Sequence, residues 1–339
     1  MSRPRVLVTS SLPGDALEVL ERSARVDLHA GDEPLGPDEL LDRVRDCDAL
    51  VCLLTDRITE SVLASAGLKL VANVAVGYDN IDMQAATRRG VLVTNTPGVL
   101  DETTADLAFG LLLACARRIA EADRYVRAGR WHRWKPDLML GTDVHGKTLG
   151  LVGFGRIGQA VARRALAFDM TVLYTRSRDP DNSGARSPGP GPHHVRLEEL
   201  LSQSDFISIH CPLNERTRHL LGERELSMLK PCCLLINTSR GPIVDQAALV
   251  AALADGRLGG AGLDVFEDEP RVPPELLAMD RVVLTPHIGS ASIETRAAMA
   301  RLAVDGLLLA FSGSLPPSAV NPQVWPLFLQ RARSCLLDR

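Results

Sequence analysis

The segment from Leu149 to Gly158 reads LGLVGFGRIG and determines the class of fold that this chain adopts. Its apolar first half is typical of a buried β-strand, and the GxGxxG that ends it opens a helix predicted over Ile157–Phe168. Gly153 permits a tight turn, Gly155 allows the backbone to approach a pyrophosphate, and Gly158 allows the helix to pack closely on the strand. The positive end of the helix would face the phosphates. The segment therefore predicts a dinucleotide-binding strand–turn–helix unit, the alternative being a turn whose glycines serve packing alone.

Short apolar runs recur along the chain, separated by amphipathic stretches rich in Ala, Leu and Arg. The predicted strands are Val6–Thr9, Ala49–Leu54, Val71–Val74, Val91–Thr94, Leu149–Gly153, Thr171–Tyr174, Phe206–Ile209, Leu234–Asn237, Gly262–Val265 and Val282–Thr285. The other helical patterns include Asp15–Ser23, Pro37–Arg45, Leu197–Gln203, Gln246–Asp255 and a long helix over about Asp101–Gly129. Alternating strands and helices favour right-handed βαβ units, and continuous Val, Ile and Leu runs are typical of sheets covered on both faces. The fold class is therefore α/β, with parallel sheets.

The composition is that of an ordinary globular protein. The 339 residues, 45% of them hydrophobic and 24% charged, are enough for two domains with sizeable cores. With 38 Lys and Arg against 42 Asp and Glu, the chain lacks the basic surplus that binding to nucleic acid or an anionic membrane requires. No apolar run approaches the roughly 20 residues of a membrane span. The seven cysteines form no CxxC pair, which favours reduced thiols in the cytoplasm.

Two turns divide the chain. Asn95–Gly98 (NTPG) and Pro286–Gly289 (PHIG) flank a self-contained series of strands and helices that includes the GxGxxG turn. We therefore expect a dinucleotide-binding domain over residues 99–287, inserted into a discontinuous second domain made of residues 1–98 and 288–339.

The choice between NAD and NADP is made at the end of the strand that follows the glycine turn. An Asp or Glu there would bind the ribose 2′-hydroxyl of NAD, but no acid occupies positions 174–178. Arg176, Ser177 and Arg178 stand there instead, and two guanidinium groups suit a 2′-phosphate. The sequence favours NADPH and leaves NADH as the alternative, in which both arginines are solvated loop residues. A Pro/Gly/Ser-rich surface loop is predicted over Arg178–Pro192.

Three predicted strands end next to residues that suit hydride transfer to a 2-oxo acid. Such a reaction needs a cation for the carboxylate, an acid for the carbonyl oxygen, and a partner that holds the acid. Arg240, Glu269 and His287 follow three strand ends, and ligands of open α/β sheets bind at that edge. Individually, each has a structural alternative: a turn cap, a solvated charge and a loop histidine. No GxSxG hydrolase motif and no metal-ligand spacing is present.

Taken in order, the motifs of the chain resemble the D-isomer-specific 2-hydroxyacid dehydrogenases, and among them the glyoxylate/hydroxypyruvate reductases most. The resemblance rests on LVTSSLP, NVAVGYDNID, TNTPGVLDETTADLAFGLLL, GKTLGLVGFGRIGQAVARR, INTSRGPIVD, GLDVFEDEP, TPHIGSAS and SAVNP, which together cover nearly the whole chain. It implies two Rossmann- or flavodoxin-like domains, the cofactor domain being inserted into a discontinuous substrate domain with the active site in the cleft. It also implies a homodimer.

The resemblance assigns a role to each matching residue. Arg240 would bind the 2-oxo acid, Glu269 would favour the protonated imidazole, and His287 would donate the proton. The other implied substrate residues are Leu53, Leu54, Val76, Gly77, Ser290 and Trp134, the last reaching the neighbouring subunit's pocket, with Trp131 as the alternative. The implied cofactor residues are Thr104, Gly153, Gly155, Arg156, Ile157, Gly158, Arg176, Ser177, Arg178, Cys211, Pro212, Thr217, Thr238, Asp264 and Gly289.

The expected activity is therefore the reduction of glyoxylate, hydroxypyruvate or both, to glycolate or D-glycerate, by NADPH. One alternative is an NADH-dependent dehydrogenase on the same scaffold that acts on another 2-oxo acid, for example a phosphorylated one. Another is a dinucleotide-sensing binding protein without catalysis, which the filled Arg240, Glu269 and His287 positions disfavour.

Overall fold

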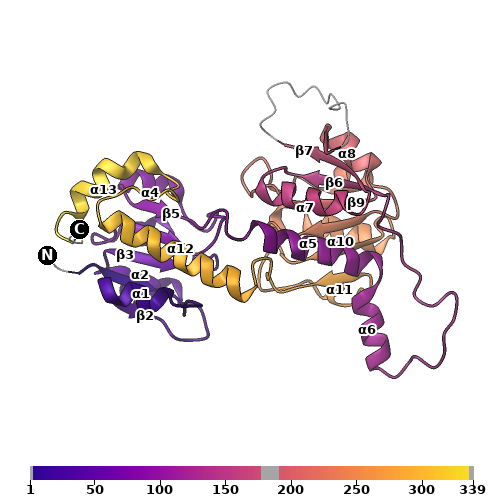
Figure 1. The fold of residues 1–339 in the computed structure, drawn as a ribbon, viewed down its shortest axis with the longest axis horizontal. Coiled ribbons are helices and arrows are strands. Elements are labelled where there is room, and N and C mark those ends of the chain that lie inside the picture. The colour runs from indigo at the N-terminus through magenta and orange to yellow at the C-terminus, as the bar shows by residue number, and fades with distance from the viewer. Residues whose placement is uncertain (1–2, 177–190, 336–339) are drawn as a thin grey trace. The chain divides into compact units, whose positions relative to one another are not determined.

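The computed structural model describes residues 3–176 and 191–335, and these form two compact units (Figure 1). The first unit consists of Met1–Leu100 and Ala291–Arg339, and the second is Asp101–Ser290. The sequence predicts the two junctions between the units after residues 98 and 287. Each unit is a parallel sheet with helices, so the predicted α/β class is confirmed.

The sheet of the first unit has five parallel strands in the order β2-β1-β3-β4-β5. This is the flavodoxin-like order, in which ligands bind beyond the carboxyl ends of the strands. The strands are β1 (Arg5–Val8), β2 (Arg25–Leu28), β3 (Ala49–Cys52), β4 (Leu70–Asn73) and β5 (Leu92–Thr94). The sequence does not predict β2, an edge strand none of whose residues is fully buried, so that it lacks the apolar run of the others.

Helices from both ends of the chain complete the first unit. The helix α12 contacts α1 as well as β3, β4 and β5, and so joins the C-terminal segment to the N-terminal sheet. The helices are α1 (Ala16–Ser23), α2 (Pro37–Val44), α3 (Glu60–Leu63), α4 (Met83–Arg89), α12 (Ile293–Phe311) and α13 (Trp325–Ala332), with the 3₁₀ turn η2 (Pro322–Val324). Burial of these apolar faces is what makes a discontinuous domain stable as one unit.

The sheet of the second unit has seven parallel strands in the order β12-β11-β10-β9-β6-β7-β8. Counted from β6, this is the Rossmann order 3-2-1-4-5-6 with one further strand, and the order reverses between β6 and β9. The strands are β6 (Thr148–Val152), β7 (Thr171–Thr175), β8 (His193–His194), β9 (Phe206–Ile209), β10 (Leu234–Asn237), β11 (Gly260–Leu263) and β12 (Val282–Leu284). The sequence analysis did not predict β8, which has two residues.

Two apolar clusters cover the two faces of this sheet. Leu149, Leu151 and Phe206 belong to one cluster, whereas Val152 and Ile207 belong to the other, as the alternation along a strand requires. The helices are α5 (Asp101–Ala116), α6 (Ile119–Arg127), α7 (Arg156–Leu166), α8 (Leu197–Gln203), α9 (Glu223–Ser227), α10 (Gln246–Ala254) and α11 (Pro274–Leu277), with the 3₁₀ turn η1 (Gly241–Ile243). In the described part of the chain, no helix combines the length and apolarity that crossing a membrane requires.

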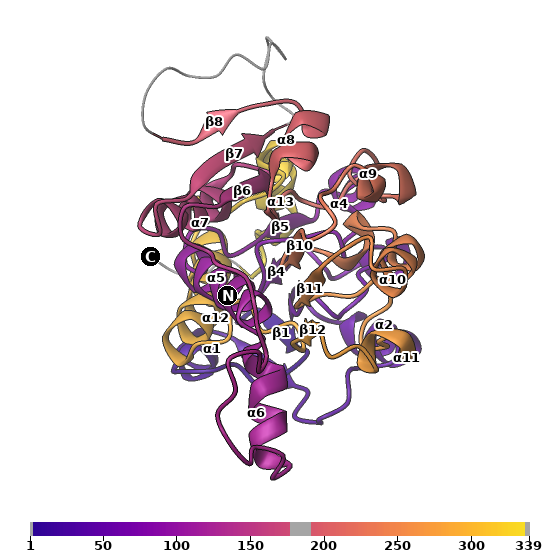
Figure 2. The same cartoon turned by 90° about the vertical axis from the view of Figure 1, so that its right-hand side faces the viewer.

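The long helix predicted over Asp101–Gly129 is interrupted, and that prediction is wrong. Arg118 adopts a left-handed conformation with φ 54°, and the chain continues as a separate helix, α6. The end of α5 is held by a returning segment, because Thr142 N–H donates to Ala116 O at 2.9 Å and the Arg118 side chain bonds to Leu140 O. Both views show α6 and the segment after it projecting from the rest of this unit (Figures 1 and 2). We call residues 119–140 the arm.

Candidate active site

The structure brings Arg240, Glu269 and His287 to one edge of the second sheet. Arg240 follows β10, Glu269 follows β11 and His287 follows β12, and these three strands are neighbours in the sheet. Because all of them run parallel, their carboxyl ends meet at the same edge, where α/β folds bind their ligands. One cation, one carboxylate and one imidazole therefore gather there.

His287 and Glu269 form a close pair. The distance from His287 Nδ1 to Glu269 Oε2 is 2.7 Å, and the two side chains are 22% and 29% exposed. A carboxylate can only accept, so Nδ1 carries the hydrogen and Nε2 remains as the second ring nitrogen. Burial raises the pKa of the Glu269 carboxyl, but the His287 bond and charge, the Phe266 N–H and the Arg240 charge together lower it below its usual value. The carboxylate is therefore charged at neutral pH.

Asp264 holds the turn that carries His287. Its Oδ1 accepts from Thr285 Oγ1 at 2.6 Å and Ile288 N at 2.8 Å, and its Oδ2 accepts from Gly289 N at 2.8 Å. Its backbone carbonyl accepts from His287 N at 2.9 Å. His287 has φ 52°, a left-handed conformation that costs free energy and persists where its surroundings enforce it. The four bonds of Asp264 supply that enforcement, and burial, the largest influence, raises the pKa of its carboxyl.

Arg240 is a half-buried side chain at the start of the turn η1. Asn237 Nδ2 donates to Arg240 O at 2.9 Å, which fixes the backbone, and Arg240 Nη1 donates to Ser239 O at 2.8 Å. Its charge reaches Glu269 and is among the causes of the lowered pKa of that carboxyl. The chemistry of this edge is a fixed cation next to a carboxylate-bound imidazole, which suits an anionic carbonyl substrate.

The glycine turn has the geometry that its sequence predicts. Gly153 has φ 102°, and a Cβ on it would lie 2.5 Å from Cys211 N. A Cβ on Gly158 would lie 2.4 Å from Gly153 O, so α7 packs against the turn as closely as glycine allows. Gly155 is the N-cap of α7 and has open space where a Cβ would be. Arg156 and Ile157 are the first residues of that helix, whose N–H groups favour a bound phosphate. The residues fit a dinucleotide.

The segment after β9 lies next to the glycine turn and is fixed internally. Ser239 Oγ donates to Cys211 O at 2.5 Å, and Thr217 Oγ1 donates to Pro212 O at 2.7 Å. Burial raises the pKa of the Cys211 thiol to about 11, so this cysteine is unreactive at neutral pH. The structure thus places Cys211, Pro212 and Thr217 beyond the end of β9, the strand next to β6.

Arg176 follows β7 directly and is exposed. Its guanidinium lies 6.0 Å from the centre of the Tyr174 ring, and Tyr174 in turn stacks on Phe154 of the glycine turn at 3.9 Å. Ser177 and Arg178, the other two residues predicted to meet a 2′-phosphate, lie outside the described residues.

Thr104, Asp264 and Gly289 also come together in the second unit. A Cβ on Gly289 would lie 3.3 Å from Asp264 Oδ2 and 3.5 Å from Thr104 Cγ2. Asp264 is fully buried, and both of its carboxylate oxygens accept hydrogen bonds from the His287 turn, so its structural role is to position that turn. Thr238 is buried beside Arg240, and its hydroxyl has no hydrogen-bond partner within residues 3–176 and 191–335. Ser290 is the last residue of the unit.

In the first unit, the predicted substrate residues lie at the carboxyl ends of β3 and β4. Leu53 and Leu54 follow β3, Val76 and Gly77 come shortly after β4, and all four are at least partly buried. Asn80 Nδ2 donates to Leu53 O at 3.1 Å, which joins the two segments.

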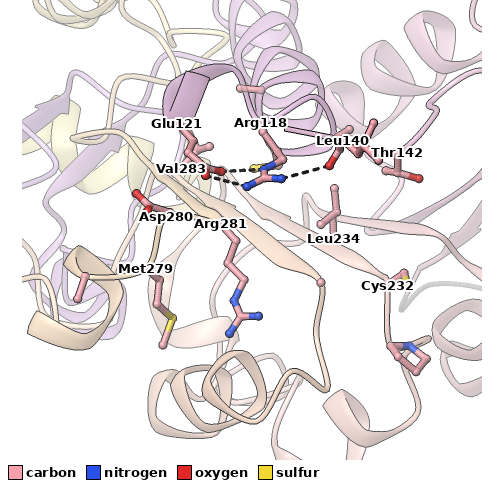
Figure 3. Close-up of a pocket in the computed structure, with 17 residues that line it drawn as sticks. Arg118, Glu121, Leu140, Thr142, Cys232, Leu234, Met279, Asp280, Arg281 and Val283 are labelled. Carbon is pink, nitrogen blue, oxygen red and sulfur yellow. Dashed lines mark hydrogen bonds and ion pairs between the residues drawn. The ribbon is translucent and has the colours of Figure 1, made fainter. Parts of the chain in front are cut away.

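Trp131 and Trp134 lie on the arm and are 57% and 75% exposed. A pocket of about 730 Å³ lies where the arm leaves the second unit, lined by Arg118, Glu121 and Arg281 among others (Figure 3). Figure 3 shows Arg118 paired with Glu121 and bonded to Leu140. The pocket includes the amino ends of β10 and β12, and is therefore at the opposite end of the strands from Arg240 and His287.

Comparison with known proteins agrees with this geometry. The sequence model for the NAD binding domain of the D-isomer specific 2-hydroxyacid dehydrogenases matches residues 109–289. The chain belongs to this family. The dehydrogenase is 51% identical to a glyoxylate reductase of Korarchaeum cryptofilum, over 95% of this chain and 97% of that protein.

Solved structures give the same result. A protein from Thermus thermophilus has a TM-score of 0.86 and 49% identity, covering 93% of the dehydrogenase and 99% of that chain. The NADPH-dependent glyoxylate/hydroxypyruvate reductase of Sinorhizobium meliloti, solved in complex with NADP and malonate, has a TM-score of 0.83 and 37% identity, covering 94% and 97%. The dehydrogenase is thus an oxidoreductase with a nicotinamide dinucleotide cofactor.

The residues that support this site were not predicted as such from the sequence. Asp264 was predicted to lie at the nicotinamide, and its bonds to the His287 turn were not foreseen. His219 and Glu267 form a further pair at 2.6 Å, which ties the segment after β9 to the loop that carries Glu269. The signal that the sequence offered for Asp264 and Glu267 was their position just beyond β11, and His219, well after the end of β9, carried none.

Proposed function

We propose that this dehydrogenase reduces glyoxylate to glycolate with NADPH, accepts hydroxypyruvate as a second substrate, and uses His287 as the proton donor. The observation that carries the proposal is the 2.7 Å contact between His287 and Glu269 next to Arg240, on a sheet edge that also bears a dinucleotide turn. The names of the relatives support the substrate: the protein from Korarchaeum cryptofilum is a glyoxylate reductase, and the one from Sinorhizobium meliloti is a glyoxylate/hydroxypyruvate reductase.

The proton transfer follows from the imidazole pair. Nδ1–H is engaged by Glu269, so Nε2–H of the protonated ring donates to the carbonyl oxygen of the substrate as the C–O bond becomes single. The negative charge of Glu269 stabilises the positive ring before transfer. When bound, the reduced cofactor supplies the hydride that C2 of the 2-oxo acid receives, so one hydride and one proton balance the reduction. In the reverse direction, neutral His287 takes the proton from the hydroxyl.

The carboxylate of the substrate needs donors that hold it during the reaction. Arg240 offers a fixed cation, whose planar guanidinium matches a carboxylate. In the first unit, the N–H groups of Val76 and Gly77 are offered as further donors, with Leu53 and Leu54 as apolar walls. A small acid such as glyoxylate needs little more than these contacts.

The preference for NADPH is supported by the residues around the glycine turn. Arg176 stands where an NAD-specific chain has an acid, and its guanidinium suits a 2′-phosphate. Thr104, Arg156, Ile157, Cys211, Pro212, Thr217, Thr238, Asp264 and Gly289 are proposed to surround the rest of the cofactor, together with Gly153, Gly155 and Gly158.

A homodimer in the cytoplasm is also proposed. The arm exposes Ile119, Val126, Trp131, Trp134 and Leu140, and exposed apolar residues in such a group are typical of a protein interface. Trp134 would then reach the partner's substrate pocket. All seven cysteines are free thiols, as the reducing cytoplasm requires. Light scattering at several concentrations tests the dimer, and a monomer at micromolar concentration would contradict it.

Two variants test the chemical roles. Arg240→Ala should raise the KM for glyoxylate and lower kcat, whereas the Kd of NADPH should stay close to that of the wild type. His287→Ala should lower kcat by roughly 10²–10⁴-fold, the usual contribution of an acid–base group. A His287→Ala enzyme with nearly full activity would show that the proton comes from elsewhere. An Arg240→Ala enzyme that loses NADPH affinity but keeps its turnover would refute the role of Arg240.

A further inference from the structure

Three successive backbone carbonyl groups of the first unit each accept a hydrogen bond from a neighbouring segment. After β4, Ala75 O accepts from Thr96 N at 3.0 Å, Val76 O accepts from Asn95 Nδ2 at 2.8 Å, and Gly77 O accepts from Asn73 Nδ2 at 2.7 Å. The donors come from the end of β4 and from the segment directly after β5. The backbone from Ala75 to Gly77 is therefore fixed at every peptide, although it belongs to no helix or strand.

These anchors set the direction of the N–H groups. The peptides are trans, since the only cis peptide in the described residues is Glu269–Pro270, and in a planar trans peptide the N–H points opposite to the carbonyl. The carbonyls of Ala75 and Val76 both point toward the segment Asn95–Thr96. The N–H groups of Val76 and Gly77 therefore both point away from that segment, toward a common side.

Neither N–H group has an acceptor within the part of the chain that the structure describes. Nothing in residues 3–176 or 191–335 accepts a hydrogen bond from Val76 N or Gly77 N. Both residues are at least partly buried, where an unsatisfied N–H is costly unless a ligand or water accepts from it. Two such donors on a fixed backbone suit an anionic group with two oxygens, such as a carboxylate.

We propose that Asn95 is a positioning residue for the carboxylate of the substrate, with Asn73 in a supporting role; this rests on the proposed function of the first unit. The side chain of Asn95 bonds to Val76 O, and that carbonyl belongs to the same peptide as the N–H of Gly77. Donors that are aimed before the substrate arrives need no reorganisation on binding, so their hydrogen bonds contribute fully to affinity. Without Asn95, the peptide can rotate, and Val76 O loses its partner.

The same network reaches the second substrate segment. Asn80 Nδ2 donates to Leu53 O at 3.1 Å and to Asp56 O at 3.0 Å, and it lies 3.4 Å from Asn73 Oδ1. Asn73 is fully buried, so its bonds to Gly77 and Asn80 are shielded from water. The amide side chains of Asn73 and Asn80 thus connect the segment after β3 to the segment after β4 and fix the two relative to each other.

The test is the variant Asn95→Ala, with Asn321→Ala as the matched control. Asn321 is a buried amide of the same unit that bonds the backbone of Val91 and Val93 and touches neither Val76 nor Gly77. For both variants, the measurements are Tm, KM and kcat for glyoxylate, the Kd of NADPH, and the Kd of oxamate, a carboxylate analogue, by calorimetry with cofactor bound. Asn95→Ala should raise the KM for glyoxylate and the Kd of oxamate by roughly ten- to a hundredfold, with the Kd of NADPH within about twofold and a much smaller change in kcat. Asn73→Ala should act in the same direction.

Three results would overturn the role of Asn95. The first is an unchanged KM and oxamate Kd in Asn95→Ala. The second is an equal rise in KM in Asn321→Ala, which would make the effect one of stability. The third is a large loss of kcat at unchanged KM, which would place Asn95 at the reacting atoms. A wild-type enzyme that binds oxamate but does not turn over glyoxylate would refute the proposed function alone, and oxamate affinity would still test Asn95.

Discussion

Replacing Glu269 by Gln removes the negative charge beside His287 while the side chain keeps its size. In the wild type, Glu269 Oε2 accepts from His287 Nδ1 at 2.7 Å and Oε1 accepts from Phe266 N at 3.0 Å. Glutamine has one acceptor oxygen for these two donors, so one of the two bonds is lost or weakened. Whichever bond the amide of glutamine keeps, it stabilises a positive imidazole less than the carboxylate does. The variant therefore loses the anion that stabilises the positive ring during proton transfer.

The magnitude follows from the contact. A hydrogen bond to a charged group contributes about 1.5–3 kcal/mol, and the side chains here are 22% and 29% exposed, so water screens the pair and the lower value applies. About 1.4 kcal/mol corresponds to a factor of ten in a rate. We therefore expect kcat/KM for the reduction of glyoxylate at neutral pH to fall about tenfold in Glu269→Gln.

The assay is the initial rate of NADPH oxidation at varied glyoxylate concentration, at neutral pH and saturating cofactor. Glu267→Gln is the matched control, because it removes the same charge two residues away, from a carboxylate that pairs with His219 instead. The control should keep the wild-type kcat/KM. A Glu269→Gln enzyme with the wild-type kcat/KM, or a control that loses as much, would contradict the role of Glu269.

Other perturbations follow from the cofactor side. Arg176→Ala should raise the KM for NADPH roughly tenfold or more and leave the KM for NADH unchanged, because only NADPH has a 2′-phosphate for this guanidinium; an equal change for both cofactors would contradict that role. Gly153→Ala should lower Tm and abolish cofactor binding, since Gly153 has φ 102° and its Cβ would lie 2.5 Å from Cys211 N. Gly155→Ala, at a position where no described residue lies within 4 Å of the added Cβ, should keep the wild-type Tm and lose only NADPH affinity. Equal thermal losses in the two glycine variants would show that the turn serves packing rather than phosphate binding.

Local patterns in the sequence predicted the main features of the fold. The Leu149–Gly158 segment forms the strand, turn and helix that its residues require, because glycine spacing and apolar runs act over a few neighbours. Exceptions arose where local pattern is weak. The edge strand β2 is only partly buried, and the break after α5 depends on the bond between Ala116 O and Thr142 N, two residues that are far apart in sequence.

The supporting residues of the site were harder to predict, for the same reason. Arg240, Glu269 and His287 could be located, because strand ends and motifs mark them. The bond between Asn95 and Val76 spans 19 residues, and that between Asp264 and Gly289 spans 25, so neither leaves a periodic signal. An Asn or Asp beyond a strand end looks like an ordinary turn residue until the tertiary contact is known.

We propose above that this dehydrogenase reduces glyoxylate with NADPH as the preferred cofactor. The most direct measurement is the steady-state kcat/KM of the purified wild-type enzyme for NADPH and NADH, each with glyoxylate and with hydroxypyruvate. We expect turnover of glyoxylate and a clear preference for NADPH with either acid. Turnover with NADH alone would contradict the role of Arg176, and tight binding of both cofactors without turnover of either acid would contradict the proposed reaction.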